Sequence, residues 1–512
     1  MILGPGRAAT VEYQPTLDDL FRAAARRNPD RVALVDSPQR AAWTDDAPRA
    51  LTYAEADRIV DAVAARLREL GLPTDSIVAV QMPHTVDGAL VLLGILRAGM
   101  IPALLPLLWR RADISAALAA VGARAIVCAG RVLETDLAEV AVHVAAETFA
   151  IRFVLGLGTQ LPDGVVPLND TFDLDTAVPE QPAAVERQGA AAQHIAVVTW
   201  DVTAAGLVPV ARSHVELLAA ATALSRDARV SDGVSIVSAI PPTSLAGLAA
   251  TLIPWLLGGG TLHCHLPFDP AVFSRQAETC RIAVLPGPVV RTLQEAGVDL
   301  ARLDAVVALW RSPDRVATWE GLHGLWLVDA LVFGEVGLVA ALRPQDGTPA
   351  RLPIGATSMP AGATDGPAIE TARTAQGTLA LRGAMVPRSA FPPGAERADL
   401  PRYKMAEDGF VDTGFPCRTD AERKEYVLDG PPAGIITVGG YRFLLREIQE
   451  AAARLGDGVT LAALPDRFSG TRLAGAATDR VSLRQALTEA GYNPLLIGAF
   501  RERRVVDQAS AA

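Results

Sequence analysis

Lysine and cysteine are both scarce in this chain of 512 residues. Lys404 and Lys424 are its only lysines, so a site built from any other segment contains none. Arginine does not simply replace a lysine that acts as a compact point charge, because its guanidinium is planar and delocalised. The four cysteines are far apart and form no CxxC pair, which argues against a disulfide framework and favours a reducing, cytoplasmic setting.

An excess of positive charge is also missing. Asp and Glu number 57 and Lys and Arg number 47, which gives a formal net charge of −10. This balance argues against broad binding of nucleic acids or of anionic membranes. One apolar run, residues 88–109, is long enough to span a bilayer, but Arg97, Gly99, Pro102 and Pro106 interrupt it. We therefore expect a buried helix that turns into a buried strand, and no integral membrane segment.

The order of apolar segments predicts the fold class. Residues 16–28 and 54–71 are typical of helices, whereas short continuous apolar runs such as Ile77–Met82 (IVAVQM) are typical of buried parallel strands. Their alternation predicts a large, layered α/β N-terminal domain. Residues 343–401 are rich in Gly, Pro and Ala, and we expect them to form a β-rich subdomain.

One break divides the chain. Gly430, Pro431 and Pro432 follow one another, and Gly and Pro together punctuate a sequence strongly. We therefore predict that the N-terminal domain comprises residues 1–429. The remaining residues, 430–512, are then a small α+β lid domain, which is within the ordinary range of domain sizes.

Several segments occur in an order that one known family shares. They include Leu92–Pro106 (LLGILRAGMIPALLP), Ile253–Thr261 (IPWLLGGGT), Asp408–Gly414 (DGFVDTG) and Val438–Phe443 (VGGYRF). Together they resemble the adenylate-forming acyl ligases, the family of acyl-CoA synthetases and AMP-binding enzymes. In that family, ATP and a carboxylic acid give an acyl-adenylate and pyrophosphate, and the acyl group usually passes to a thiol. The resemblance therefore implies ATP or AMP with Mg and coenzyme A, and a hydrophobic carboxylic acid or an acyl carrier as partner.

The family's phosphate loop corresponds to residues 199–214, which read TWDVTAAGLVPVARSH. Gly206 matches a glycine of that loop and Thr203 stands at one of its hydroxyl positions, so both are candidate nucleotide-site residues. The loop lysine is absent, and the first glycine position carries Asp201 or Val202. A carboxylate or a branched side chain there opposes the nest of backbone amides that phosphate needs. We therefore expect a strand-to-helix loop without a phosphate ligand.

A second nucleotide-site segment is altered at Phe333–Gly337 (FGEVG), which corresponds to the family's Y-G-x-T-E. Gly337 replaces the metal-associated glutamate, and Gly334 and Glu335 remain as candidate nucleotide-site positions. Glu335 either substitutes for the lost acid or is, as we expect, an ordinary exposed loop acid. No residue is assigned as a metal ligand.

Three other family features are changed. The ribose-binding T-G-D stretch becomes Thr413, Gly414 and Phe415, so a phenyl ring replaces its carboxylate, while the first two remain candidate nucleotide-site residues. A Gly-Gly pair near the nucleotide becomes Trp310-Arg311, and the indole either fills the adenine position or, as we expect, packs in the core. The family's second catalytic lysine is also missing, since no lysine follows Pro432.

By resemblance, residues 241–248 (PPTSLAGL) and 286–288 (PGP) line the acyl pocket. Their small, apolar character suggests a hydrophobic ligand. The candidate substrate-binding residues are Ser244, Gly247, Gly287 and Trp310.

Two hypotheses about function follow. The losses favour a non-catalytic relative, a pseudoenzyme that binds an acyl compound or a protein partner, because a single donor or charge in such a site is typically worth about 10²–10³ in rate. The alternative is an active ATP-dependent acyl-adenylate-forming ligase that uses non-standard residues. No catalytic residue is assigned.

Overall fold

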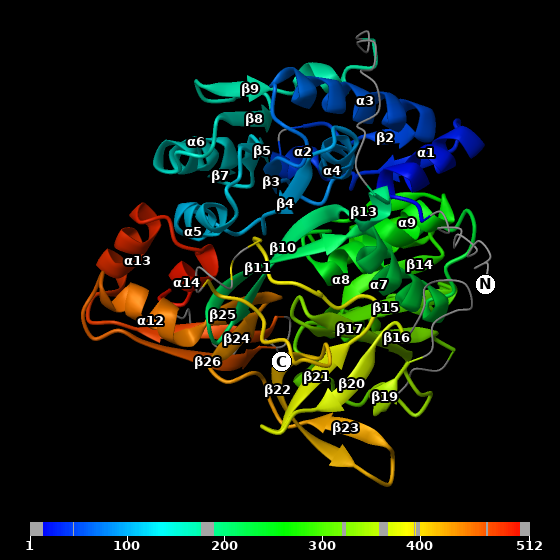
Figure 1. Ribbon diagram of the computed structural model, residues 1–512, viewed down its shortest axis with the longest axis vertical. Coiled ribbons are helices and arrows are strands. Elements are labelled where there is room, and N and C mark those ends of the chain that lie inside the picture. Colours follow the sequence, from blue (N-terminus) through cyan, green and yellow to red (C-terminus); the bar gives the residue numbers. More distant parts are fainter. Residues whose placement is uncertain are drawn as a thin grey trace, which may run out of the picture.

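The computed structural model describes residues 14–44, 46–175, 189–319, 324–357, 367–393, 395, 400–466 and 469–501. Figure 1 shows two layered α/β lobes, a β-rich sheet and a small C-terminal domain. The fold class expected from the sequence is confirmed: a large α/β N-terminal domain with a β-rich part precedes a smaller α+β domain. In the described part of the chain, no helix is long and apolar enough to cross a membrane.

The first lobe is built on a seven-stranded sheet. It is parallel except for the edge strand β11, which pairs antiparallel with β10 in a hairpin. The apolar run that begins near residue 88 forms a helix and then a strand of this lobe, as expected. In spatial order the strands are β11 (Gly206–Ser213), β10 (Ile195–Thr203), β4 (Ile101–Leu104), β3 (Ile77–Gln81), β5 (Ala125–Ala129), β8 (Phe153–Leu157) and β9 (Val165–Pro167).

The second lobe is built on an eight-stranded sheet. Its six inner strands are parallel and its two outermost strands pair antiparallel with their neighbours. In spatial order the strands are β17 (Gly337–Leu342), β16 (Leu327–Phe333), β15 (Ala305–Trp310), β14 (Ile282–Pro286), β12 (Ile236–Ser238), β13 (Leu262–Cys264), β1 (Val32–Val35) and β2 (Ala50–Thr52).

Helices cover both sheets, and the sequence sets where several of them begin. Thr16, Thr52 and Ser213 each cap a helix through a hydroxyl, and an acid three residues later returns a hydrogen bond to the cap backbone. The helices of the two lobes are α1 (Leu17–Arg27), α2 (Ala41–Thr44), α3 (Tyr53–Glu69), α4 (Val86–Arg97), α5 (Arg111–Val121), α6 (Leu137–Glu147), α7 (His214–Asp227), α8 (Leu245–Gly247), α9 (Ile253–Gly258), α10 (Pro270–Ala277) and α11 (Gly287–Glu295).

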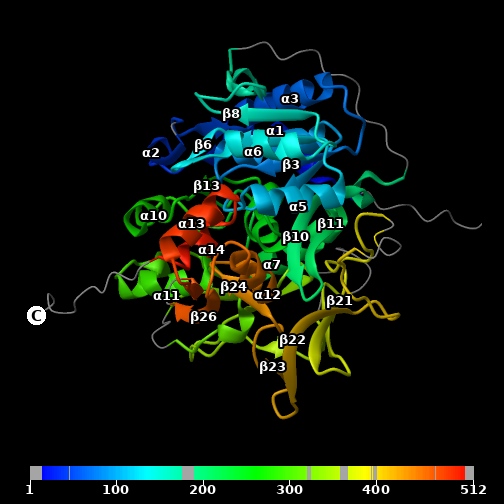
Figure 2. The same ribbon diagram turned by 90° about the vertical axis from the view of Figure 1, so that its left-hand side faces the viewer.

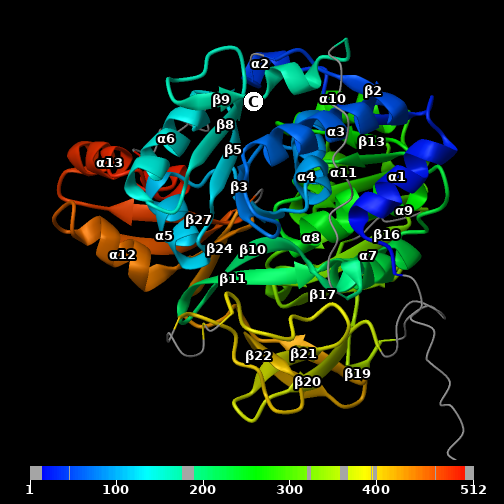
Figure 3. The ribbon, with the colours of Figure 1, turned by 45° about the horizontal axis from the view of Figure 1, so that its top comes forward.

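The β-rich part is a six-stranded antiparallel sheet that lies at the bottom of the molecule in Figure 3. Four of its strands, β18 to β21, come from the Gly-, Pro- and Ala-rich segment that the sequence assigns to a β-rich subdomain, and the other two follow that segment. Its strands are, in spatial order, β18 (Leu352–Pro353), β23 (Glu425–Leu428), β22 (Val411–Asp420), β21 (Thr378–Arg382), β20 (Glu370–Arg373) and β19 (Gly355–Ala356).

The small C-terminal domain has its own hydrophobic core, made only of residues between 436 and 500. Figure 2 shows its helices beside α5 and the β10–β11 hairpin, and the backbone N–H of Ala112 in α5 donates to the carbonyl of Gly491. The division at residues 429 and 430 stays a prediction. The elements are β24 (Ile435–Val438), β25 (Tyr441–Leu444), α12 (Leu445–Ala453), β26 (Thr460–Asp466), β27 (Gly470–Ala476), α13 (Arg480–Glu489) and α14 (Pro494–Gly498).

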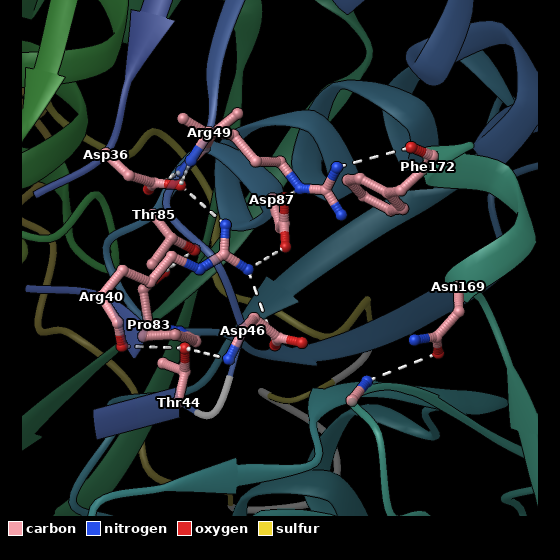
Figure 4. Close-up of polar contacts among 12 residues, drawn as sticks. Asp36, Arg40, Thr44, Asp46, Arg49, Pro83, Thr85, Asp87, Asn169 and Phe172 are labelled. Atoms are coloured by element: carbon pink, nitrogen blue, oxygen red, sulfur yellow. Dashed lines mark hydrogen bonds and ion pairs between the residues drawn. The ribbon is translucent and has the colours of Figure 1, made fainter. Parts of the chain in front are cut away.

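A buried charge network joins the end of β1 to the first turn of α4 (Figure 4). Arg40 donates to Asp36 at 2.7 Å and also pairs with Asp87, and all three side chains are at most 3% exposed. Asp36 accepts two further hydrogen bonds, from the backbone N–H groups of Val86 at 2.8 Å and Arg49 at 3.0 Å. Burial raises the pKa of Asp36, and the charge of Arg40 opposes that rise.

We predict that Arg40→Met destabilises the large domain by about 3–5 kcal/mol, because it leaves the buried carboxylate of Asp36 without its cation and leaves Asp87 paired with Arg49 alone. The measurement is the urea-unfolding transition of the variant against the unmodified protein. Arg446→Met is the control, since Arg446 and Glu450 form an exposed pair on α12, and it should change stability by no more than about 0.5 kcal/mol. Equal, small effects of the two variants would contradict the structural role of Arg40.

His84 connects the two lobes. It follows β3 of one sheet, and its Nε2 lies 3.0 Å from the carbonyl oxygen of Ser238, the last residue of β12 in the other. A neutral ring with its proton on Nε2 donates this bond. Burial lowers the pKa of His84 to about 4, and the hydrogen bond to Ser238 only partly opposes that effect.

We predict that His84 makes the protein less stable as the pH falls from about 6.5 to about 4. The unfolded chain takes up the proton in this window and the folded chain does not, so stability is present above it and lost below, by about 2–3 kcal/mol at pH 4.5. Urea unfolding at pH 7.5 and pH 4.5 measures the loss in the unmodified protein and in His84→Gln. Since glutamine can keep the bond to Ser238 but does not titrate, parallel losses in both proteins would refute the prediction.

Candidate functional site

A cavity of about 880 Å³ lies at the carboxyl ends of β12, β14, β15 and β16. Crevices at this edge of an open α/β sheet are the usual place for a ligand, and the volume is within the range of small-molecule sites. The small domain closes the other side with Thr437, residues 439–442, Asp466 and residues 469–470. The cavity is therefore bounded by both domains.

Indole rings form much of the cavity wall. The rings of Trp109 and Trp200 lie 5.8 Å apart, and those of Trp310 and Trp319 lie 5.7 Å apart. Pro106, Pro241, Pro286 and Pro288 add further apolar surface.

Trp310 both lines the cavity and packs in the core. Its Nε1 donates to Asp329 at 2.8 Å, and Asp329 forms a fully buried ion pair with Arg343 at 3.0 Å. The indole also lies so close to Gly287 that a Cβ at that glycine would collide with it. The core packing expected for Trp310 agrees with these contacts, whereas Gly287 supports the indole and is not part of the lining.

The segment that corresponds to the phosphate loop is a β-hairpin, so the expectation of a strand-to-helix loop is wrong. β10 and β11 pair in register from Trp200 opposite Pro209 to Thr203 opposite Gly206, and only two residues connect them. The reason is local, since β-branched residues with high strand propensity occupy both arms. Thr203 and Gly206 form the turn: the Thr203 hydroxyl accepts from the N–H of Ala205 at 3.1 Å, and Gly206 has a φ of 109°.

Asp201 is the polar centre of this hairpin. Its carboxylate accepts from the Tyr403 hydroxyl at 2.6 Å, from the backbone N–H of Glu335 at 2.9 Å and from Arg442 at 2.5 Å. Its side chain is 2% exposed and that of Arg442 is 13% exposed. Gly334 makes this approach feasible, because a Cβ there would collide with both Asp201 and Arg442.

Glu335 is buried and bound, so its interpretation as an exposed loop acid is wrong. Its carboxylate accepts from the Thr199 hydroxyl at 2.6 Å and from the backbone N–H of Leu245 at 2.9 Å. Arg212 donates to the backbone carbonyl of Glu335 and lies 3.6 Å from its carboxylate. Burial raises the pKa of Glu335, and the charge of Arg212 opposes the rise.

Ser244 connects α8 to the cavity. Its hydroxyl accepts from the N–H of Gly247 at 3.2 Å and from the guanidinium of Arg311 at 3.0 Å. Gly247 packs so closely on the carbonyl of Pro241 that a side chain would collide there, and it is not part of the lining. Of the four candidate substrate-binding residues, only Ser244 and Trp310 line the cavity.

The stretch that replaces the ribose-binding motif lies in β22, away from the cavity lining. Thr413 donates its hydroxyl to the carbonyl of Leu379 at 2.7 Å, and Gly414 has a φ of 75°. Phe415 is 3% exposed and meets Phe333 edge-to-face at 5.4 Å. Thr413 and Gly414 therefore have structural contacts, and of the six candidate nucleotide-site positions only Gly334 and Glu335 line the cavity.

The residues present do not fit a magnesium nucleotide. Asp201 places a carboxylate in the segment that corresponds to the family's phosphate loop, and the donors around it are already bound to it. Gly337, at the position of the family's metal-associated acid, faces Ile369, Leu381 and Met385. Across the described ranges, no group of three or more His, Cys, Asp or Glu side chains could hold a metal ion.

Sequence reasoning did not identify the contacts between the two domains. Arg311 donates to the carbonyl of Gly440 at 3.3 Å, and the N–H of Leu108 donates to the Tyr441 hydroxyl at 3.3 Å. These partners are more than 100 residues apart, so no local pattern could pair them. The available signal was the match of Val438–Phe443 to the start of the family's C-terminal domain.

Comparison with solved structures supports the same fold. The amide bond synthetase McbA from Marinactinospora thermotolerans superposes with a TM-score of 0.68 over 94% of both chains, at 18% identity. The artificially fused adenylation–PCP di-domain NpsA-ThdA from Klebsiella oxytoca gives a TM-score of 0.68 at 17% identity, over 95% of this chain and 93% of that one. At these identities the likeness concerns the fold alone.

Sequence relatives agree with that fold. The 2-hydroxy-7-methoxy-5-methyl-1-naphthoate–CoA ligase of Streptomyces carzinostaticus is 27% identical over 479 residues, which cover 88% of this chain and 81% of that protein. Long-chain fatty acid transport protein 1 of Homo sapiens is 32% identical over 170 residues, 33% of this chain, and the match spans only 24% of that relative. The family model "AMP-binding enzyme" matches residues 21–325. The chain therefore belongs to the AMP-binding enzymes, the family of adenylate-forming ligases.

Proposed function

We propose that this chain is a non-catalytic member of its family that binds a hydrophobic carboxylic acid in the cavity without activating it through ATP. The observation that carries the proposal is the ion pair of Arg442 with Asp201, which lies on the hairpin that corresponds to the family's phosphate loop. A buried carboxylate repels phosphate oxygens. The nearest cation of the small domain is already neutralised by it.

The surroundings of the altered positions support this proposal. A side chain at Gly337 would meet apolar atoms of Ile369 and Leu381, so this position is poorly suited to an acid that binds a metal ion. Phe415 packs on Phe333 where the family has a carboxylate. Restoring nucleotide binding would therefore require several coordinated changes.

The cavity supports a carboxylic acid as ligand, because four tryptophans and four prolines give its lining apolar surface and four arginines give it positive charge. Two relatives are named for hydrophobic carboxylic acids, a substituted naphthoate and a long-chain fatty acid. An acyl carrier that delivers such a group is the alternative partner. The four cysteines are free and buried, which supports a reducing, cytoplasmic setting.

The second candidate function is an active ATP-dependent ligase that forms an acyl-adenylate through non-standard residues. It is favoured by the retention of a cavity at the carboxyl ends of the strands, closed by the small domain. Glu335 and Arg212 would then be the replacement ligands, although both are bound within the protein.

We predict that calorimetric titration with ATP and Mg gives no micromolar binding, and that a panel of hydrophobic acids releases neither AMP nor pyrophosphate. The physical reason is the buried negative charge of Asp201. Asp201→Asn is the informative variant: it removes that charge and leaves Arg442 unpaired, so residual ATP affinity should rise. Micromolar ATP affinity or AMP release from the unmodified protein would favour the ligase function instead.

We also predict that Phe415→Asp does not create ligase activity and lowers stability by about 2–5 kcal/mol, because it removes a buried ring and buries a charge. When catalytic groups act as a unit, restoring one of them alone adds little to the reaction rate. Thermal melting measures the destabilisation, and an assay of acyl-adenylate formation measures activity. Phe415→Leu is the control, since it keeps an apolar side chain, and ordinary turnover by a folded Phe415→Asp variant would disprove the interpretation.

A further inference from the structure

Among the described residues, no carboxylate lies within ion-pair distance of Arg311 in the cavity wall, although the charge of Glu335 acts on it from farther away. The other three arginines of the wall each have a nearby carboxylate, but in the described residues Arg311 has no ion pair. Its positive charge is therefore available to an anionic ligand in the cavity. The three paired arginines are Arg291 with Glu295 at 3.0 Å, Arg315 with Asp314 at 3.9 Å and Arg442 with Asp201 at 2.5 Å.

Neutral groups of both domains hold Arg311 in place. One terminal nitrogen donates to the Ser244 hydroxyl at 3.0 Å, and the other donates to the carbonyl of Gly440 at 3.3 Å. Gly440 has a φ of 87°, and a Cβ there would lie 2.7 Å from the Cδ of Arg311. A guanidinium has five N–H donors in a fixed plane, so two contacts fix its position and leave donors for a ligand.

The wall next to Arg311 is aromatic. Trp310 precedes it in the chain and lies 5.7 Å from Trp319, and a second indole pair, Trp109 and Trp200, lies 5.8 Å apart. Indole rings pack favourably against planar aromatic groups in offset or edge-to-face arrangements. The hydrogen bond from Trp310 to Asp329 fixes one of these rings before a ligand arrives.

We propose that Arg311 anchors the carboxylate of an aromatic monocarboxylic acid, whose ring contacts the indole walls of the cavity. This inference rests on the proposed function, because it names the ligand class of the same cavity. One unpaired guanidinium matches one carboxylate in two parallel hydrogen bonds. A phosphate dianion fits less well, since it would have this single cation and two nearby acids, Asp201 and Glu335, in the same wall.

The experiment titrates the full chain, without ATP, with 2-naphthoate, 2-naphthalenemethanol and 2-naphthyl phosphate, followed by tryptophan fluorescence and calorimetry. We expect 2-naphthoate to bind at least about 10-fold more tightly than the neutral alcohol, as a charge-assisted pair implies. Arg311→Gln should remove this preference and leave binding of the alcohol unchanged. Arg311→Lys should keep part of it, because the charge remains and the planar fork is lost.

Arg281→Gln is the matched control. Arg281 pairs with Asp304 at the opposite end of β14 and β15, with its side chain 60% exposed. Its substitution should leave all three affinities unchanged. Thermal melts check folding, and Arg311→Lys carries the test if Arg311→Gln does not fold.

The outcomes separate this inference from the proposed function. The inference would be overturned if naphthoate and the alcohol bound equally, or if neither bound. It would also be overturned if neither Arg311 variant changed the preference for naphthoate, or if the phosphate bound more tightly. Release of AMP after ATP is added would overturn the proposed function alone. The role of Arg311 is measured without nucleotide and would then still stand.

Discussion

The ion pair between Asp201 and Arg442 determines the arrangement of the whole site. It joins the hairpin of the large domain to β25 of the small domain. A buried pair of this kind is stable only if further hydrogen bonds satisfy its remaining lone pairs. The Tyr403 hydroxyl and the N–H of Glu335 provide these bonds, and Gly334 leaves the space for them. As a result, the hairpin that corresponds to the family's phosphate loop is bound to the small domain, and the small domain closes one side of the cavity.

Asp201 and Glu335 belong to two of the altered segments and contact each other, because the backbone N–H of Glu335 donates to the carboxylate of Asp201. Asp201 attracts Arg442 and Tyr403, while Glu335 is bound by Thr199 and lies near Arg212. These polar groups are partners of one another within the protein. Replacing Asp201 by the glycine of the family sequence would therefore leave the nearly buried guanidinium of Arg442 without its carboxylate.

Much of the fold could be predicted from the sequence, because its signals are local. The helix after Thr16 is marked by a hydroxyl cap and by Asp19 three residues later, and the strand Ile77–Gln81 by a continuous apolar run. The contacts of the site were harder to predict from the sequence, because they join segments that are far apart in the chain. Asp201 and Arg442 are separated by 241 positions, and Glu335 is buried by partners as far away as Thr199. The sequence places Glu335 between Gly334 and Gly337, which is typical of a loop, so its burial could not be predicted without knowing those partners.

The walls of the cavity are held in place by the pairing of the strands that carry them. Pro286 and Leu309 lie opposite one another in the register of β14 and β15, and Trp310 lies opposite Leu331 in that of β15 and β16. These positions are fixed by parallel pairing at the centre of a sheet, so changing them would disturb the fold itself. The hairpin that corresponds to the family's phosphate loop lies instead at an edge of the other sheet, where β11 has a neighbouring strand on one side only. Sheet pairing therefore fixes the walls of the cavity more firmly than it fixes the hairpin, and the ligand binding that we propose depends on those walls and not on the hairpin.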